Sequence, residues 1–265
     1  MQADEPGSLP KISITSLTRV FDTGGGRLAA LGPVDLTVRP GEFVSIVGPS
    51  GCGKSTLLYM LGGFLQPSSG SLLADGRPIT GPGVDRGIVF QEYALFPWLT
   101  VADNIAYGLR MKRMQAGELR DRVAAAIAMI GLGGFEHRFP RELSGGMKQR
   151  VALARTFIYD PQILLLDEPF GALDSQTREL MQDELLELWR STGKTVLMVT
   201  HDVAEAVYLS NRVCVMSQRP GRVVAQFPIS LDHDKGREAV MLSDQYRALH
   251  DQVWLEVRRQ VGGKG

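Results

Sequence analysis

The sequence predicts an α/β fold with a mostly parallel sheet, antiparallel strands near the N-terminus and an inserted helical subdomain. Nearly continuous apolar runs predict the parallel strands, because a strand buried on both faces lacks polar alternation. The runs alternate with stretches of helical apolar spacing, which is typical of an α/β core. A glycine-rich segment directly follows the first run. The runs are Phe43 to Val47, Ile163 to Leu166, Thr195 to Val199 and Arg212 to Met216.

The N-terminal part reads as a hairpin that precedes this core. Lys11 to Val20 alternates apolar and polar residues, as an edge strand would. The triplet Gly24-Gly25-Gly26 marks a turn, and Leu36 to Val38 reads as a further strand. Residues 1–10 are expected to form a flexible tail, and they lack the apolar core of a signal peptide.

Helical spacing appears after the glycine-rich segment, from Ser55 to Gly62, and again from Asp103 to Gly131 and from Gln176 to Arg190. A last helix is expected from Ser243 to Val261, with Tyr246, Leu249, Val253, Trp254 and Val257 on one face. The expected domains are a core at 11–225, a helical subdomain inserted at about 92–155, and a short C-terminal extension at 226–265.

Composition argues against several classes of protein. Lys plus Arg and Asp plus Glu both total 29, so the net charge is zero, whereas nucleic-acid binders usually carry a basic excess. Two cysteines are too few for a secreted disulfide framework, which favours a reducing compartment. No stretch approaches the about 18 apolar residues of a transmembrane helix. We expect a cytoplasmic chain that another subunit anchors if it works at a membrane.

Residues 48–56 read G-P-S-G-C-G-K-S-T, which is a P-loop pattern. Its glycines let backbone N–H groups turn toward an anion, and the start of the next helix completes the anion site. Lys54 is expected to reach the β- and γ-phosphates of ATP, and Ser55 to ligate Mg²⁺. The alternative is a glycine-rich turn with an incidental lysine, which the flanking strand and helix disfavour. The expected ATP contacts here are Gly48, Pro49, Ser50, Gly51, Cys52, Gly53, Lys54, Ser55 and Thr56.

Two carboxylates, Asp167 and Glu168, end the apolar run that begins at Ile163. Ligands gather at the carboxyl ends of strands in open α/β sheets. Asp167 is therefore expected to hold Mg²⁺, and Glu168 to polarise a water molecule. The alternative is a pair of residues that cap the next helix. Together with the P-loop, this pair predicts hydrolysis of ATP to ADP and phosphate.

A second glycine motif, L-S-G-G-M-K-Q-R at 143–150, also precedes a helix. Ser144, Gly145 and Gly146 would form another anion-binding helix N-terminus. A monomer with one ATP site has no use for two such termini. A head-to-tail pair does, because the second motif of each subunit can close over the ATP on the other subunit's P-loop.

These motifs resemble those of the ATP-binding cassette (ABC) family of ATPases, over about residues 11–225. Met147 departs from the glutamine that is usual in the family's L-S-G-G-Q signature, but Ser144 and Gly146 are intact. Phe21 stands about where the family has an aromatic residue that stacks on adenine; alternatively it packs in the core. The motifs follow the family's order, which is the P-loop at 48–56, Gln91 after the strand 87–90, the signature at 143–149, Asp167-Glu168, Ala172-Leu173-Asp174 and Val199-Thr200-His201-Asp202.

The resemblance implies roles for further residues. Gln91 would contact Mg²⁺ and the attacking water, and His201 would hydrogen-bond the γ-phosphate. Asp174 would contact the P-loop of the partner subunit in a homodimer that closes on two Mg-ATP. Arg150 and Arg155 are expected to be structural ion-pair residues on the signature helix.

Shorter motifs resemble those of the nitrate, sulfonate and taurine importer ATPases. This resemblance implies an importer subunit for such an anion, on the cytoplasmic face of a bacterial inner membrane. Its implied partners are two transmembrane permease subunits and, indirectly, an extracytoplasmic solute-binding protein, with no nucleic acid. The motifs are Gly62-Gly63-Phe64, Gly81-Pro82-Gly83, Arg86 to Gln91, Leu95 to Trp98, Pro169 to Asp174 and Pro220 to Val223.

Three other functions compete with this interpretation. An ABC exporter or lipoprotein-release ATPase would share this chemistry and differ only in its partners. An ABC-type DNA-repair ATPase would carry a long coiled-coil insertion, and this chain lacks sustained heptads between the P-loop and the signature. A P-loop kinase would lack the signature motif.

The segment Tyr93 to Trp98 is unusually aromatic for a loop. One interpretation is core packing. The other is a groove near Tyr93, Phe96 and Trp98 that receives a short helix of the permease.

Overall fold

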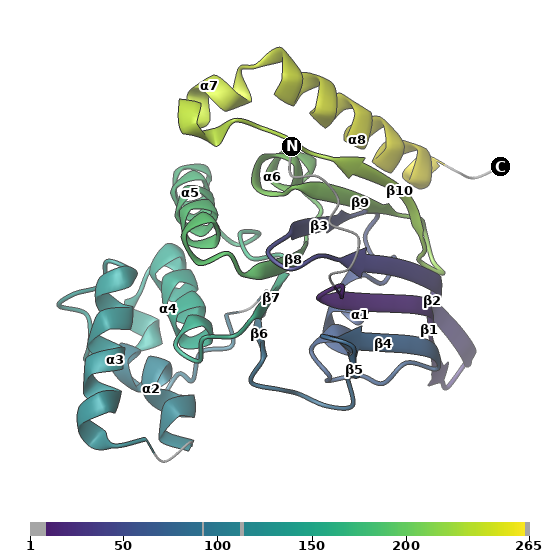
Figure 1. Cartoon of the computed structure of the whole chain (residues 1–265). Helices are drawn as coiled ribbons and strands as arrows, with labels where there is room; N and C mark the ends of the chain where they lie inside the picture. Colours follow the sequence, from purple (N-terminus) through teal and green to yellow (C-terminus); the bar gives the residue numbers. More distant parts are fainter. Residues whose placement is uncertain (1–8, 92, 112–113, 263–265) are drawn as a thin grey trace. The chain divides into compact units, whose positions relative to one another are not determined.

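The computed structural model describes residues 9–91, 93–111 and 114–262 (Figure 1). Residues 1–8 of the expected flexible tail lie outside the described residues. The chain divides into two compact units, which are described separately below. The first unit comprises residues 1–82 and 193–265, and the second comprises residues 83–192.

The first unit contains a four-stranded antiparallel sheet in the order β2-β1-β4-β5. Thr23 pairs with Gly26, so Gly24 and Gly25 form the turn of the predicted hairpin. The prediction of an edge strand at 11–20 is wrong, because β4 pairs with the free side of β1. The segment of β4, S-G-S-L-L-A, has only three apolar residues and a glycine, so its composition does not predict a strand. The strands are β1 (Ile12–Thr23), β2 (Gly26–Val38), β4 (Ser69–Ala74) and β5 (Arg77–Pro78).

The same unit contains three of the four strands that the apolar runs predict. Strand β3 lies between β8 and β9 and is parallel to both, while β10 is antiparallel to β9. All five residues of β3 are buried, which explains its mostly apolar sequence. The strands are β3 (Phe43–Val47), β8 (Thr195–Val199), β9 (Arg212–Met216) and β10 (Val223–Pro228).

Helix α8 packs along α6, β9 and β10, so the C-terminal extension belongs to this unit (Figure 1). Tyr246 and Val253 are its buried residues. Trp254 was expected on the packed face, but it is 42% exposed, with the Arg258 guanidinium 5.0 Å from its ring. The helices of the unit are α1 (Lys54–Leu61), α6 (Val203–Leu209), α7 (Arg237–Met241), α8 (Asp244–Gly262) and the 3-10 turn η2 (His233–Lys235).

The second unit combines one pair of parallel strands with the helical subdomain. The helical stretch expected from 103 to 131 consists of two helices, α2 and α3. Among the described residues of the chain, no helix is long and apolar enough to cross a bilayer. The elements are β6 (Arg86–Val89), α2 (Val101–Met111), α3 (Ala116–Met129), the 3-10 turn η1 (Pro140–Glu142), α4 (Gly145–Phe157), β7 (Ile163–Asp167) and α5 (Ser175–Thr192).

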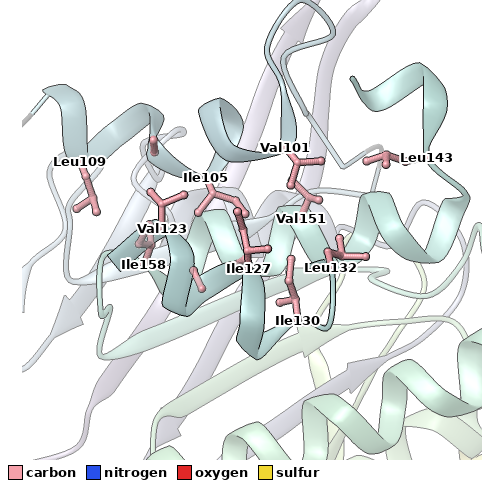
Figure 2. Packing of buried hydrophobic residues seen from close by; sticks show 13 residues of the cluster. Val101, Ile105, Leu109, Val123, Ile127, Ile130, Leu132, Leu143, Val151 and Ile158 are labelled. Carbon is pink, nitrogen blue, oxygen red and sulfur yellow. The ribbon is translucent and has the colours of Figure 1, made fainter. Parts of the chain in front are cut away.

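Helices α2, α3 and α4 share an apolar core (Figure 2). Val101, Ile105 and Leu109 contribute from α2 at a spacing of four residues, which places them on one face of the helix. Asn104 is buried beside them, and its side chain bonds to backbone atoms of Phe96, Leu99 and Thr100. The loop before α2 is therefore fixed to the helix by a fully used amide side chain.

Candidate active site

The P-loop connects buried strand β3 to helix α1, as the sequence predicts. Gly51 has φ +74° and Gly53 has φ +106°, values that favour glycine. Gly53 is also the residue before α1, so the loop delivers its backbone directly to the helix N-terminus. A Cβ atom on Gly48 would lie 2.8 Å from the carbonyl oxygen of Met216, so the loop is closely packed on the end of β9.

Lys54 is folded into this loop. Its side chain is only 6% exposed, and Nζ donates to the carbonyl oxygens of Gly48 at 2.8 Å and Pro49 at 3.1 Å. Nζ also lies 3.9 Å from the sulfur of Cys52. A buried ammonium with neutral acceptors is a point charge that an anionic phosphate can attract.

His201 lies at the same sheet edge as the P-loop. Ile46 of β3 pairs with Val199 of parallel strand β8, so Gly48 and His201 each stand two residues beyond that register pair. The N–H of Thr200 donates to the carbonyl oxygen of Ile46 at 3.1 Å, which fixes the end of β8 beside β3. The structure thus brings together the P-loop and the histidine that the resemblance implies as a phosphate ligand.

Phe21 belongs to strand β1 in the same unit. It is partly exposed, and the guanidinium of Arg19 lies 4.4 Å from the centre of its ring. Phe21 is therefore not part of the buried core, which was the alternative reading. An aromatic ring with one accessible face is suited to stacking on a base.

Asp167 and Glu168 lie at the end of β7 in the second unit. Asp167 is the last residue of the strand and is 1% exposed. Glu168 has φ +44°, a costly conformation for a residue with a side chain, and such strain concentrates at functional sites. Val89 of β6 pairs with Leu166, so Gln91 follows the neighbouring strand end, and its Nε2 donates to Oε2 of Glu168 at 3.2 Å.

The alternative reading of Asp167 and Glu168 as helix caps does not hold. The next helix, α5, begins at Ser175, and its cap is Asp174, whose Oδ1 accepts from the N–H of Thr177 at 3.0 Å. This backbone hydrogen bond lowers the pKa of Asp174 below its usual value. Asp174 is exposed apart from this bond, so its carboxylate is ionised and available at the surface.

The second glycine motif forms the start of α4. Ser144 is the residue before the helix, and its Oγ accepts from the N–H of Met147 at 3.3 Å. A Cβ atom on Gly146 would lie 2.4 Å from Cγ2 of Thr177, so a side chain at this position would displace the Thr177 methyl group on α5. The Met147 side chain packs partly against the helical core, which gives this departure from the signature an apolar environment.

The structure reveals a role for Arg155 that the sequence did not indicate. Arg150 forms the expected ion pair, with Glu184 at 2.6 Å. Arg155 instead donates to the carbonyl oxygens of Tyr93 and Ala94, at 3.1 and 2.7 Å. The ion-pair prediction is therefore wrong for Arg155 among the described residues. Tyr93 and Ala94 have φ of 58° and 46°, so Arg155 holds a strained segment just after Gln91. Neither residue type marks such a turn in a sequence.

Known proteins match the chain over most of its length. Residues 31–171 match the family described as ABC transporter. The taurine import ATP-binding protein TauB of Burkholderia pseudomallei is 48% identical over 257 residues, which are 96% of this chain and 99% of that protein. The nitrate import ATP-binding protein NrtD of a Synechocystis species is 47% identical over 224 residues, or 84% of each chain.

A solved structure agrees with these relatives. It is a dimeric ATP-binding cassette in a post-hydrolysis state, bound to ADP and phosphate. It matches with a TM-score of 0.74 and 34% identity, over 83% of this chain and 99% of that one. The predicted fold class is thus confirmed. The chain belongs to the ABC transporter family and is one of its ATPases.

Proposed function

We propose that this chain is the ATP-hydrolysing subunit of an importer for a sulfonate, taurine or nitrate-type anion. The observation that carries the proposal is the 48% identity to a taurine import ATP-binding protein over 96% of the chain. The nitrate import relative at 47% identity supports the same class of solute. The chain would bind the cytoplasmic side of a bacterial inner membrane peripherally, through two permease subunits that an extracytoplasmic solute-binding protein serves.

In the proposed reaction, water attacks the γ-phosphate of ATP in line with the leaving ADP. Lys54 would exchange its carbonyl acceptors for the β- and γ-phosphate oxygens. Glu168, held by Gln91, would orient the water and accept its proton. His201 would donate to the γ-phosphate and neutralise the charge that develops there.

The proposed residues suit Mg²⁺. This ion takes oxygen ligands, usually including one or two carboxylates, together with substrate phosphates and water. The hydroxyl of Ser55, the amide oxygen of Gln91 and the buried carboxylate of Asp167 are ligands of that kind. When bound, Mg²⁺ would offset the negative charge of the phosphates.

The active unit would be a head-to-tail homodimer with two ATP molecules at its interface. Ser144 and the N–H groups at the start of α4 would face the γ-phosphate on the partner's P-loop. Asp174, ionised and exposed after capping α5, would contact the partner's P-loop. A dimeric relative bound to ADP and phosphate supports this arrangement.

The permease would dock on an aromatic patch formed by Phe96, Trp98 and Tyr107. The ring centres of Trp98 and Tyr107 lie 5.6 and 4.4 Å from that of Phe96. Trp98 is 69% exposed and Tyr107 is 41% exposed, so core packing does not explain Trp98. Exposed aromatic residues on a rigid base commonly anchor partner helices, and Asn104 provides that base by fixing the loop.

The proposal is tested in cells that lack the gene. Such cells should fail to use taurine or another sulfonate as sulfur source, or nitrate as nitrogen source, and the wild-type chain should restore growth. The Glu168→Gln chain should not restore it. Normal uptake of all these anions in the deletion strain, together with loss of efflux or lipoprotein release, would assign the chain to the exporter class instead.

A further inference from the structure

Arg219 holds the outer side of the P-loop. Its guanidinium donates from both Nε, at 3.0 Å, and Nη2, at 2.8 Å, to the carbonyl oxygen of Gly51. The two residues are 168 positions apart in the sequence and belong to the same unit. Gly51 has φ +74°, and a glycine is the residue least restrained by its own sterics, so an external contact has the greatest effect there.

The loop that carries Arg219 is itself anchored. It connects β9 to β10, and the N–H of Ser217 donates to the carbonyl oxygen of Arg222 at 2.9 Å. The N–H of Gly221 donates to the carbonyl oxygen of Ala30 at 3.1 Å, and the N–H of Gly32 donates to the carbonyl oxygen of Gly221 at 3.0 Å. Both backbone groups of Gly221 therefore bond the loop to strand β2. Arg219 is therefore presented from a fixed base.

The loop also touches the P-loop at a second point. A Cβ atom on Gly221 would lie 2.0 Å from the carbonyl oxygen of Cys52, so only glycine allows the two backbones to approach this closely. Arg219 and Gly221 thus contact the carbonyl groups of consecutive residues, Gly51 and Cys52. Two adjacent peptide units of the P-loop are restrained from outside the loop.

The C=O and N–H of a trans peptide point in opposite directions. Fixing the Gly51 carbonyl toward Arg219 therefore fixes the N–H of Cys52 on the opposite side of that peptide. There it donates to the carbonyl oxygen of Pro49 at 3.3 Å, the same oxygen that Lys54 contacts. The N–H is thus directed into the loop, toward the carbonyl oxygen that also accepts from Lys54.

We propose that Arg219 is a positioning residue of the P-loop, which holds the Gly51–Cys52 peptide in the orientation that binds phosphate. This proposal rests on the proposed role of the P-loop in holding ATP. Arg219 acts through the loop backbone, not on the phosphates. Its loss should therefore weaken binding of ATP more than it slows the chemical step, because part of the binding free energy would be used to order the loop.

The two cysteines provide a direct readout in the nucleotide-free chain. Cys52 lies in the P-loop and Cys214 in strand β9, and both are buried. A thiol reagent reaches Cys52 when the loop opens, whereas it reaches Cys214 only when the sheet opens. Burial raises the pKa of Cys52, and the cations of Lys54 and Arg219 oppose that shift. Loss of Arg219 would on its own make this thiol less reactive, so faster labelling would report loop opening and not the change of charge.

The experiment compares labelling of the two cysteines by N-ethylmaleimide, read by mass spectrometry, in the full-length chain and its variants. Arg219→Ala should raise the labelling rate of Cys52 and the Kd for ATP by about tenfold each, the factor expected for one charge-assisted hydrogen bond. Labelling of Cys214 and kcat should stay within about twofold of wild type. Arg219→Lys, which keeps the cation but has a single donor nitrogen, should recover part of both effects. Arg222→Ala, which removes an exposed cation from the same loop, should change neither.

Three outcomes would overturn the proposal. Unchanged Cys52 labelling in Arg219→Ala would show that the arginine does not hold the loop, whatever happens to the Kd. An equal rise at Cys52 and Cys214 would show a general loss of stability. A large fall in kcat with an unchanged Kd would place Arg219 in the chemistry. Failure of the P-loop assignment itself would look different. Lys54→Ala would then bind ATP as the wild type does, while Arg219→Ala would still show faster labelling of Cys52.

Discussion

The side-chain amide of Gln91 donates to the carboxylate of Glu168 at 3.2 Å, across the ends of two neighbouring parallel strands. This contact orients the carboxylate that we propose as the base, and Glu168 itself is held at φ +44°. When the base is already positioned before the substrate arrives, less free energy is needed to orient it for the reaction. The contact also joins Glu168 to the segment that leads to the aromatic patch.

Glu168→Gln should retain ATP binding and lower hydrolysis by about two orders of magnitude or more, the scale of a lost general base. The amide keeps an oxygen that accepts from Gln91, so the local structure should persist. The measurement is steady-state turnover in the assembled transporter, with nucleotide affinity measured on the isolated chain. Glu187→Gln, a change at an exposed carboxylate on α5, is the matched control and should leave turnover unchanged. Turnover near wild type in Glu168→Gln would remove Glu168 from the mechanism.

Lys54→Ala should weaken ATP binding, because it removes the ammonium that lies against Gly48 and Pro49. Lys235→Ala, at an exposed lysine on η2, should have no such effect. Unchanged ATP affinity in Lys54→Ala would argue against the assignment.

Composite sites can be tested by mixing Lys54→Ala chains with Ser144→Arg chains. A mixed dimer can place both defects in one site and leave the other site intact. The mixture should therefore show more ATPase activity than either variant alone. The Glu168→Gln chain should also dimerise in the presence of ATP. Activity equal to the average of the two variants, or full transport-linked turnover by a monomer, would contradict the dimer.

Trp98→Ala should weaken binding to the permease or uncouple hydrolysis from transport, while nucleotide affinity stays unchanged. Because Trp98 is 69% exposed, the free energy of unfolding should change by less than about 1 kcal/mol. Leu180→Ala, at a 61% exposed leucine on α5, controls for the loss of apolar surface. Ile105→Ala, at a fully buried core residue of α2, should instead cost about 2–5 kcal/mol. A Trp98→Ala transporter that assembles and works normally would place the docking site elsewhere.

Tyr246 should make stability depend on pH in the alkaline range. Burial, and secondarily Asp202, raises its pKa from 10.0 to about 12, and its hydroxyl donates to the carbonyl oxygen of Ala204 at 3.3 Å. Above about pH 10 the unfolded chain releases this proton while the folded chain keeps it, so stability falls as pH rises toward 12. In urea unfolding, the free energy of unfolding of Tyr246→Phe should fall less steeply with pH than that of the wild type. Cys214 also has a pKa raised to about 12, but this thiol is present in both the wild type and Tyr246→Phe, so it does not affect the comparison. Identical pH profiles would show that Tyr246 ionises at its ordinary pKa.

The elements that the sequence predicted correctly are those with strong local signals. The run from Phe43 through the P-loop to α1 is contiguous, and each part is dictated by neighbours within a few residues. The same holds for β7 and Asp167, and for the helical spacing in α2 and α5. Strands β4 and β10 and helices α6 and α7 were missed, because they are short and mixed in composition, so pairing and packing decide them.

The sequence by itself determined the fold class and the family, and it predicted the residues that we propose to face ATP, because these depend on short motifs whose chemistry is local. Only the tertiary structure decided that β1 is an interior strand, that Arg155 holds the segment after Gln91, and that Arg219 holds Gly51. Each of these contacts joins residues far apart in the chain. The physical reason is that a hydrogen bond between distant residues depends on the register and packing of whole elements, which leave no periodic pattern in the sequence around either partner.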